Sequence, residues 1–161
     1  MCGRYTLYTG EEAEEIRQII DIAQRQVNGQ LKLGEVFPSD RATILVANQD
    51  KVVVRTATRG FPGFQGKGLL INARSETAEE KYLFQYEDST VVYLAGLWEM
   101  FEGKRRYTIL TTQPNQAIAA VHNRMPVLLA KEQVRPWLIV TTAALGMLNG
   151  SQPELVGKLL K

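Results

Sequence analysis

The first regular pattern of hydrophobic and polar positions predicts an amphipathic helix over residues 9–28. Four apolar residues recur at the three- and four-residue spacing of one helix face: Ile16, Ile19, Ile20 and Ala23. Thr9, with Glu12 three residues later, is a typical N-cap, and Asn28-Gly29 is a typical helix stop. The chain is therefore expected to place one amphipathic helix near its start.

Beyond this helix the pattern changes to short β-branched runs. These are ATILVA, KVVVRTAT, GLLIN, TVVYLAGLW and RYTILTT, and turn signals such as Asn48-Gln49-Asp50 and Glu102-Gly103 separate them. NQAIAAVHN and KEQVRPWLIV are short helical candidates, the second divided by Pro136, and residues 141–160 are expected to form a loosely packed helical tail. The pattern indicates an α+β fold, with a single β-rich domain over residues 1–161, an N-terminal helix and short flanking helices.

Composition narrows the classes of protein. The net charge of +2 permits a nucleic-acid partner without arguing for one. A single cysteine excludes an intramolecular disulfide framework and suits a reducing compartment. The acidic start GEEAEEIRQ is unlike a signal peptide, and no stretch has the length of a membrane span. We expect a cytoplasmic monomer.

Few residues are capable of chemistry. With one cysteine and one histidine, His122, the chain cannot build a zinc site of the Cys/His type, and we expect no metal and no cofactor. GFPGFQGKG lacks phosphate-loop spacing and is interpreted as a surface loop. A Cys–His pair could form an activated thiolate, but His122 could equally be a hydrogen-bonded residue near a helix end.

The cysteine lies at position 2, where it has a special option. If Met1 is removed, Cys2 carries a free α-amine beside its thiol, which together form a 1,2-aminothiol. Two other stretches are unusual. INARSET aligns Asn72, Arg74 and Glu76 on one face of an extended segment, and VHNRMP ends a helical pattern before a proline. Polar groups aligned directly after an apolar run are costly in a core and useful in a pocket.

MCGRY, INARSET and HNRMPVLL, in that order, resemble the SOS-response-associated peptidase (SRAP) family, and the similarity extends over roughly residues 1–140. The resemblance implies an SRAP-like fold that binds abasic sites in single-stranded DNA, nucleoid-associated when bound, with a covalent crosslink through Cys2. It also implies an associated autoproteolytic peptidase activity. The matching residues are Cys2, Asn72 and His122 for chemistry, with Arg4, Arg74 and Arg124 for DNA.

The implied reaction is chemically sound. An open abasic deoxyribose is an aldehyde, and an α-amine titrates near ~8, so part of it is neutral and nucleophilic at cellular pH. The amine of Cys2 can form a Schiff base, and its thiol can close a five-membered thiazolidine ring, helped by proximity. Asn72 can hydrogen-bond the amine or sugar, and His122 can shuttle protons.

The chain also departs from the family pattern. Members of the family carry a segment reading Arg-Cys-…-Gly-Phe-Tyr-Glu-Trp whose Glu acts as acid–base, and the stretch between INARSET and AGLW is too short to hold it. Glu99 is the candidate replacement for that Glu. A tryptophan that usually follows the second strand is replaced by Arg59, which predicts a phosphate contact in place of stacking. Without a carboxylate the crosslink could still form, while its reversal would slow.

Two other functions stay open at this point. An N-terminal-nucleophile amidohydrolase of the glutamine amidotransferase type also begins Met-Cys-Gly, which explains Cys2 but neither of the other two motifs. A degenerate SRAP member that binds DNA without a covalent bond would explain the lost segment. Retention of Met1 would leave Cys2 with an amide nitrogen and would prevent the thiazolidine.

Overall fold

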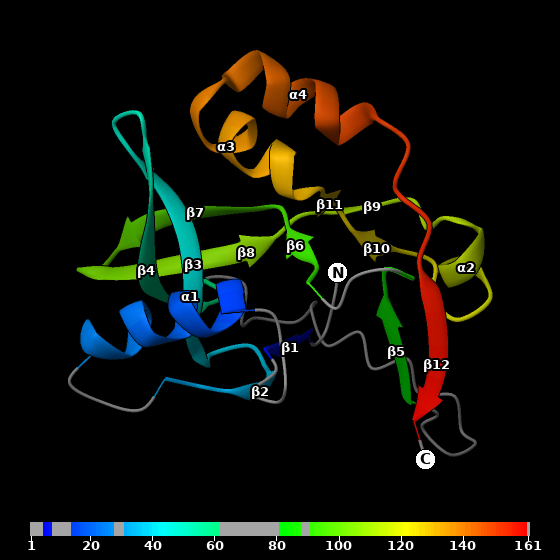
Figure 1. Ribbon diagram of the computed structural model, residues 1–161, viewed down its shortest axis with the longest axis horizontal. Helices are drawn as coiled ribbons and strands as arrows, with labels where there is room; N and C mark the ends of the chain where they lie inside the picture. Colours follow the sequence, from blue (N-terminus) through cyan, green and yellow to red (C-terminus); the bar gives the residue numbers. More distant parts are fainter. Residues whose placement is uncertain (1–4, 8–13, 28–30, 62–80, 88–90, 161) are drawn as a thin grey trace.

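The computed structural model describes residues 5–7, 14–27, 31–61, 81–87 and 91–160 (Figure 1). The helices are α1 (Glu14–Arg25), α2 (Gln116–Ala119), α3 (Lys131–Ile139) and α4 (Thr141–Asn149). The longer strands are β3 (Arg41–Asn48), β4 (Lys51–Arg59), β5 (Lys81–Gln85), β7 (Gly96–Phe101), β8 (Lys104–Ile109) and β12 (Val156–Leu160). The shorter strands are β1 (Tyr5–Leu7), β2 (Gly34–Val36), β6 (Tyr93–Leu94), β9 (Thr111–Thr112), β10 (Met125–Pro126) and β11 (Leu128–Leu129).

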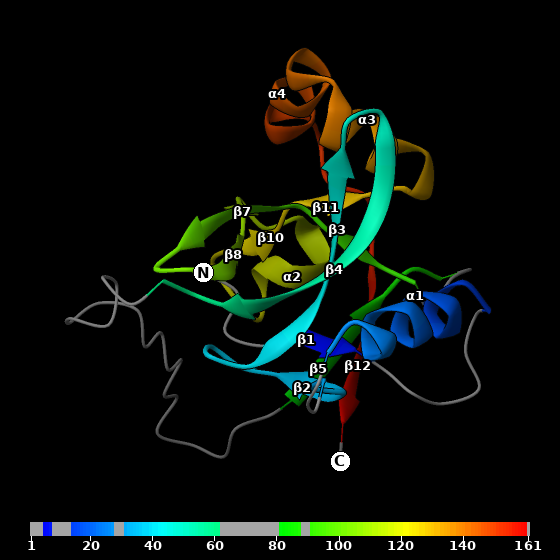
Figure 2. The same ribbon diagram turned by 90° about the vertical axis from the view of Figure 1, so that its left-hand side faces the viewer.

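The largest sheet has the strand order β3-β4-β8-β7 and consists of two hairpins joined side by side. Within each hairpin the strands are antiparallel, and β4 pairs with β8 in parallel, with Arg59 opposite Tyr107. Glu102 and Gly103 both have positive φ angles, 48° and 73°, at the tight turn between β7 and β8. Figure 2 shows this hairpin extending away from the helices.

Two hydrophobic clusters cover opposite faces of this sheet. One contains Ala57 and Tyr107, and Val36 of β2 and Tyr5 of β1 pack against it. The other contains Val54 of β4 together with the buried face of α1. Because successive strand residues point to opposite faces, Ala57 and Val54 belong to different sides, as the two clusters require. The β1-β2 ribbon and α1 therefore cover different faces.

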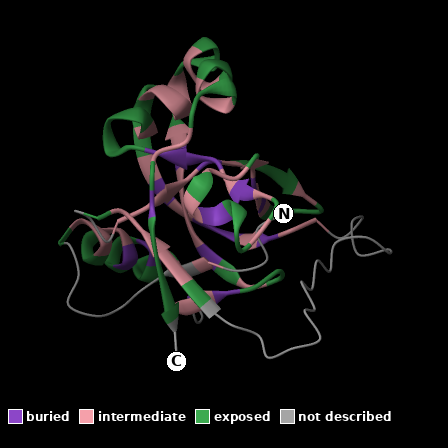
Figure 3. Ribbon diagram, turned by 90° about the vertical axis from the view of Figure 1, so that its right-hand side faces the viewer, coloured by how far each residue is buried: buried purple, intermediate pink, exposed green. Residues whose placement is uncertain are grey.

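The remaining short strands form two-stranded pairs: β10-β9, β11-β6 and β12-β5. Two further buried clusters form around them, with Met125, Val127 and Leu129 among their least exposed members. α3 and α4 form a pair at the top of Figure 1 and contain no buried residue, whereas most of the buried residues belong to strands (Figure 3). None of the helices in the described part of the chain has the length and apolar character to cross a membrane.

The α+β class expected from the sequence is confirmed, with differences in detail at Pro136 and in the C-terminal tail. The first helix is present from Glu14, and its predicted start at Thr9 lies outside the described residues. Pro136 does not divide α3, because a proline removes only one intrahelical hydrogen bond and the helix continues to Ile139.

The helical tail predicted for residues 141–160 is wrong in its second half. α4 ends at Asn149, and Val156–Leu160 forms β12, paired antiparallel with β5. Gly150 and Pro153 interrupt the helical pattern, and β5 supplies a pairing partner that the local sequence does not reveal. The predicted strand GLLIN falls in residues 62–80, outside the described residues.

Candidate functional site

Four predicted site residues, Cys2, Arg4, Asn72 and Arg74, lie outside the described residues. The site is therefore defined here by the residues next to them in the chain and by the His122 segment. Tyr5 directly follows Arg4 and is the first described residue.

Tyr5 is tied to the central sheet at several points. As part of β1 it pairs with Val36 of β2, and its hydroxyl oxygen lies 2.6 Å from that of Tyr107 on β8. Tyr107 is only 5% exposed. Burial raises the pKa of the Tyr107 hydroxyl well above its ordinary value, aided by the neighbouring Tyr5. The Tyr107 hydroxyl is consequently neutral at cellular pH, and its contact with Tyr5 fixes the first described residue of the chain.

Arg59 lies beside this tyrosine pair and is buried, with 5% of its surface exposed. Its guanidinium carbon lies 5.4 Å from the centre of the Tyr5 ring, and its Nη1 donates to the carbonyl oxygen of Val36 at 2.8 Å. A cation stacked on an aromatic face is stabilising, more so when desolvated. These contacts suit positioning of Tyr5. The burial gives no support to the phosphate contact predicted for Arg59, which stays a prediction.

The segment that carries His122 follows α2 and is well ordered by hydrogen bonds. Asn115 caps α2 through its side chain, which accepts from the backbone N–H of Ile118 at 3.2 Å, and the backbone N–H of His122 donates to the carbonyl oxygen of Ile118. His122 is half-buried, as expected for a histidine near a helix end. His122 is therefore a hydrogen-bonded residue near a helix end, and its chemical role stays a prediction.

The His122 ring is held by the backbone of Arg124. Nδ1 lies 3.0 Å from the N–H of Arg124 and 2.9 Å from its carbonyl oxygen. A neutral ring that accepts from this N–H carries its proton on Nε2, whereas a charged ring can donate from Nδ1 to the carbonyl oxygen. In both protonation states, Nδ1 therefore finds its partner in the backbone of Arg124.

Arg124 itself is oriented by Thr111 of β9. One guanidinium nitrogen donates to both the carbonyl oxygen and the hydroxyl of Thr111. β9 directly continues β8 along the chain, so the partner of Arg124 lies four residues after Tyr107, the partner of Tyr5. The two ordered segments are thereby connected through one strand path.

Glu99 lies on the edge strand β7 and is exposed. It is opposite Arg106 in the register, while Trp98 is opposite Tyr107. Since neighbouring strand residues alternate between faces, Glu99 is on the other face of the sheet from Tyr107 and its partner Tyr5. This placement does not favour Glu99 as the acid–base group for Cys2, and the assignment stays a prediction.

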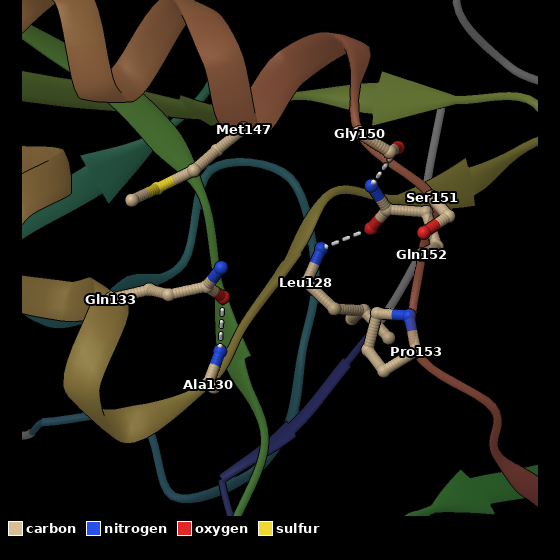
Figure 4. A pocket seen from close by; sticks show the side chains of 8 residues that line it. All are labelled: Leu128, Ala130, Gln133, Met147, Gly150, Ser151, Gln152 and Pro153. Atoms are coloured by element: carbon tan, nitrogen blue, oxygen red, sulfur yellow. Dashed lines mark hydrogen bonds between the residues drawn. The ribbon is translucent and has the colours of Figure 1, made fainter.

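A cavity of about 310 Å³ lies between β11, α3 and the segment after α4 (Figure 4). Its polar side chains are used within the fold: the Gln152 side chain accepts from Leu128 N–H at 2.7 Å, and that of Gln133 from Ala130 N–H at 2.9 Å. It has no titratable lining residue. Within the described ranges, no group of three or more His, Cys, Asp and Glu is placed to hold a metal ion.

Sequence patterns did not predict the contact between Tyr5 and Tyr107. Tyr5 belongs to the MCGRY motif, and Tyr107 lies in the run RYTILTT, but 102 residues separate them. No local pattern indicates such a contact. The one general indication is that a buried tyrosine hydroxyl usually has a hydrogen-bond partner, but this does not identify the partner.

Comparison with known proteins gives matches to one family. Residues 79–154 match the family described as SOS response associated peptidase (SRAP). The chain is 27% identical over 181 residues to abasic site processing protein YoaM of Bacillus subtilis (strain 168), covering 86% of this chain and 79% of YoaM. It is 28% identical over 188 residues to abasic site processing protein YoqW of Bacillus phage SPbeta, covering 86% and 80%. The chain is therefore similar to the SOS response associated peptidases, as its three ordered motifs predict.

Proposed function

We propose that this chain processes abasic sites in single-stranded DNA and does so by a covalent crosslink through Cys2 after removal of Met1. The names of the matched relatives, abasic site processing proteins, support the first part of this proposal, the processing of abasic sites. The observation that carries the covalent step is the contact between Tyr5 and Tyr107, which fixes the chain three residues after Cys2.

Chain geometry limits how far the reactive groups can be from each other. Three residues span at most about 11 Å, so Cys2 is within that distance of Tyr5. Four residues span at most about 14 Å, which bounds the path from Tyr107 to Thr111, the residue that orients Arg124. These lengths are compatible with our proposal that the Cys2 amine and the His122 ring share one pocket.

The reaction is a condensation followed by ring closure. The neutral α-amine of Cys2 adds to the sugar aldehyde, and loss of one water gives the Schiff base. The thiolate of Cys2 then adds to the imine carbon, and the nitrogen takes up a proton to give the thiazolidine. Because both nucleophiles belong to one residue, ring closure has a high effective concentration.

His122 suits the proton transfers in this scheme. When Nδ1 carries a proton and donates it to the carbonyl oxygen of Arg124, the ring can gain and lose a proton at Nε2 without losing its orientation. We assign Asn72 to hydrogen bonding of the amine or sugar, and Arg4, Arg74 and Arg124 to the DNA phosphates. Glu99 is left out of the scheme because it lies on the face opposite to Tyr107.

The test is a denaturing gel with single-stranded DNA that contains one abasic site. We expect the wild-type protein to give a heat- and denaturant-stable adduct and Cys2→Ser to give none, because oxygen closes the ring far less readily than sulfur. Affinity for undamaged DNA should be unchanged in Cys2→Ser.

Intact-mass measurement of the purified protein belongs to the same experiment. It must show loss of Met1 and, after reaction, the mass of protein plus DNA minus one water. An undiminished adduct from Cys2→Ser would overturn the mechanism. Glutamine hydrolysis without adduct would instead support the amidohydrolase, and retention that denaturant abolishes would support a non-covalent DNA-binding member.

A further inference from the structure

The edge strand β7 exposes large apolar side chains. Leu97 is 58% exposed, Trp98 42% and Met100 57%. An edge strand ordinarily limits such exposure, because apolar edges promote unwanted pairing. The exposure of a tryptophan among them indicates a surface that is covered when a partner is bound.

The register divides these side chains between the two faces of the β7-β8 hairpin. Trp98 is opposite Tyr107, and Met100 is opposite Arg105. These residues share one face, whereas Leu97 and Glu99 are on the other. We call the set Trp98, Met100 and Arg105 the Trp98 platform.

The platform directly continues the tyrosine pair near the N-terminus. Tyr107, the cross-strand neighbour of Trp98, contacts the Tyr5 hydroxyl, and Arg59 stacks on Tyr5 beside it. Directly opposed residues in an antiparallel pair have Cβ atoms about 5 Å apart. A polynucleotide that reaches Tyr5 and follows this face would therefore reach Trp98 next.

The chemistry of the platform suits single-stranded nucleic acid. Tryptophan offers a flat face on which any base can stack, and the exposed Arg105 offers a guanidinium for a phosphate. The nearby acids are placed elsewhere: Glu99 is on the other face, and Glu102 is in the turn. The Trp98 face thus combines an exposed aromatic ring with positive charge and no acid, whereas the other face places Glu99 beside Lys104 and Arg106.

We propose that the Trp98 platform binds the single-stranded DNA that flanks the abasic site, with a base stacked on Trp98 and a phosphate on Arg105. This inference rests on the proposed function, since the flank is defined by the site at Cys2. It adds a second contact region on the β7-β8 hairpin, which none of the three motifs contains.

The first arm of the test measures affinity for undamaged oligothymidylate. Trp98→Leu should weaken binding about 5- to 100-fold, the range expected for loss of one base–aromatic stack. Trp98→Phe keeps an aromatic ring and should retain most of the affinity. Leu97→Ala is the matched control on the same strand and the opposite face, and it should bind like the wild type. Thermal unfolding of each variant checks that the fold is intact.

The second arm measures how binding depends on salt. Arg105→Gln should lower the slope of log affinity against log salt by about 0.7, the value for one phosphate contact on a single strand. Lys104→Gln removes the same charge from the neighbouring residue, which points to the other face, and should leave the slope unchanged.

The outcomes separate this proposal from the proposed function. Undamaged DNA reports only on the platform, and the denaturant-stable adduct with abasic DNA reports only on Cys2. If the wild type formed no adduct while Trp98→Leu still weakened oligothymidylate binding, the platform would stand without the crosslink. Equal affinities of Trp98→Leu, Leu97→Ala and the wild type would overturn the platform and would point to a protein partner for the exposed strand.

Discussion

The hydroxyl oxygens of Tyr5 and Tyr107 lie 2.6 Å apart although 102 residues separate them in the chain. This contact joins the short strand β1 to the centre of the four-stranded sheet. It places the start of the described chain against the face that also carries Arg59 and Trp98. The position of Tyr5 is therefore determined by a part-buried polar pair, whose contribution to stability can be measured.

Removal of either hydroxyl should destabilise the fold. Tyr5→Phe leaves the Tyr107 hydroxyl buried without this partner, which should lower the free energy of unfolding by about 1–3 kcal/mol. Tyr107→Phe should have a smaller effect, because the Tyr5 hydroxyl is less buried. Urea unfolding of the two single variants and the double variant measures the coupling. We expect the double variant to lose less stability than the sum of the two single losses. Additive losses would contradict an interaction between the two hydroxyls.

The same pair predicts a loss of stability at alkaline pH. Burial raises the pKa of Tyr107 in the folded protein above 10, its ordinary value. A raised folded-state pKa means that the stabilisation is complete below pH 10 and is lost as the pH rises above it, because the unfolded chain releases the proton first. The Tyr107 hydroxyl alone lowers the free energy of unfolding by up to about 1.4 kcal/mol per pH unit in this range.

Unfolding midpoints in urea between pH 9 and pH 11.5 check this expectation. The decline should be less steep in Tyr107→Phe than in the wild type. Identical slopes in the two proteins would show that the Tyr107 hydroxyl ionises as freely in the folded state as in the unfolded state.

The sequence predicted the local elements well where a periodic pattern was enough. Helix α1 and the strands β3, β4 and β8 follow directly from their hydrophobic spacing. β12 was not predictable in this way. Its short run VGKLL is compatible with helix or strand, and pairing with β5, some seventy residues earlier, decides between them.

In the candidate site, too, local motifs were predictable from the sequence and distant contacts were not. The resemblance of three motifs predicted His122 and the N-terminal region as parts of the site. The structure then showed which groups orient them, such as the backbone of Arg124 for the His122 ring. The face on which Glu99 lies could not be foreseen, because it depends on the register between β7 and β8. A shift by one residue would have reversed it. Contacts between distant residues, such as Tyr5 with Tyr107, have no local signature at all.

A variant of Arg59 tests whether this residue positions Tyr5 or contacts DNA. Arg59→Met keeps the apolar stem but removes the donor to Val36 and the cation over the Tyr5 ring. We expect the free energy of unfolding to fall by about 3.5–5 kcal/mol, the sum of a charged hydrogen bond and a desolvated cation–π contact. The salt slope of binding to undamaged single-stranded DNA should not change. A slope lower by about 0.7 would instead establish the phosphate contact predicted from the sequence.

The roles of His122 and Glu99 can be separated by rates of adduct formation at saturating abasic DNA. His122→Gln cannot transfer a proton at Nε2 and should slow the reaction by about 100-fold, with DNA affinity unchanged. Glu99→Gln should react at the wild-type rate, because its side chain extends from the face of β7 opposite to Tyr107 and Tyr5. Thermal unfolding of both variants verifies that the sheet and the segment after α2 are intact. A slow Glu99→Gln with undiminished affinity would show that the carboxylate reaches the reacting amine. It would restore Glu99 as the replacement for the acid–base residue of the missing segment.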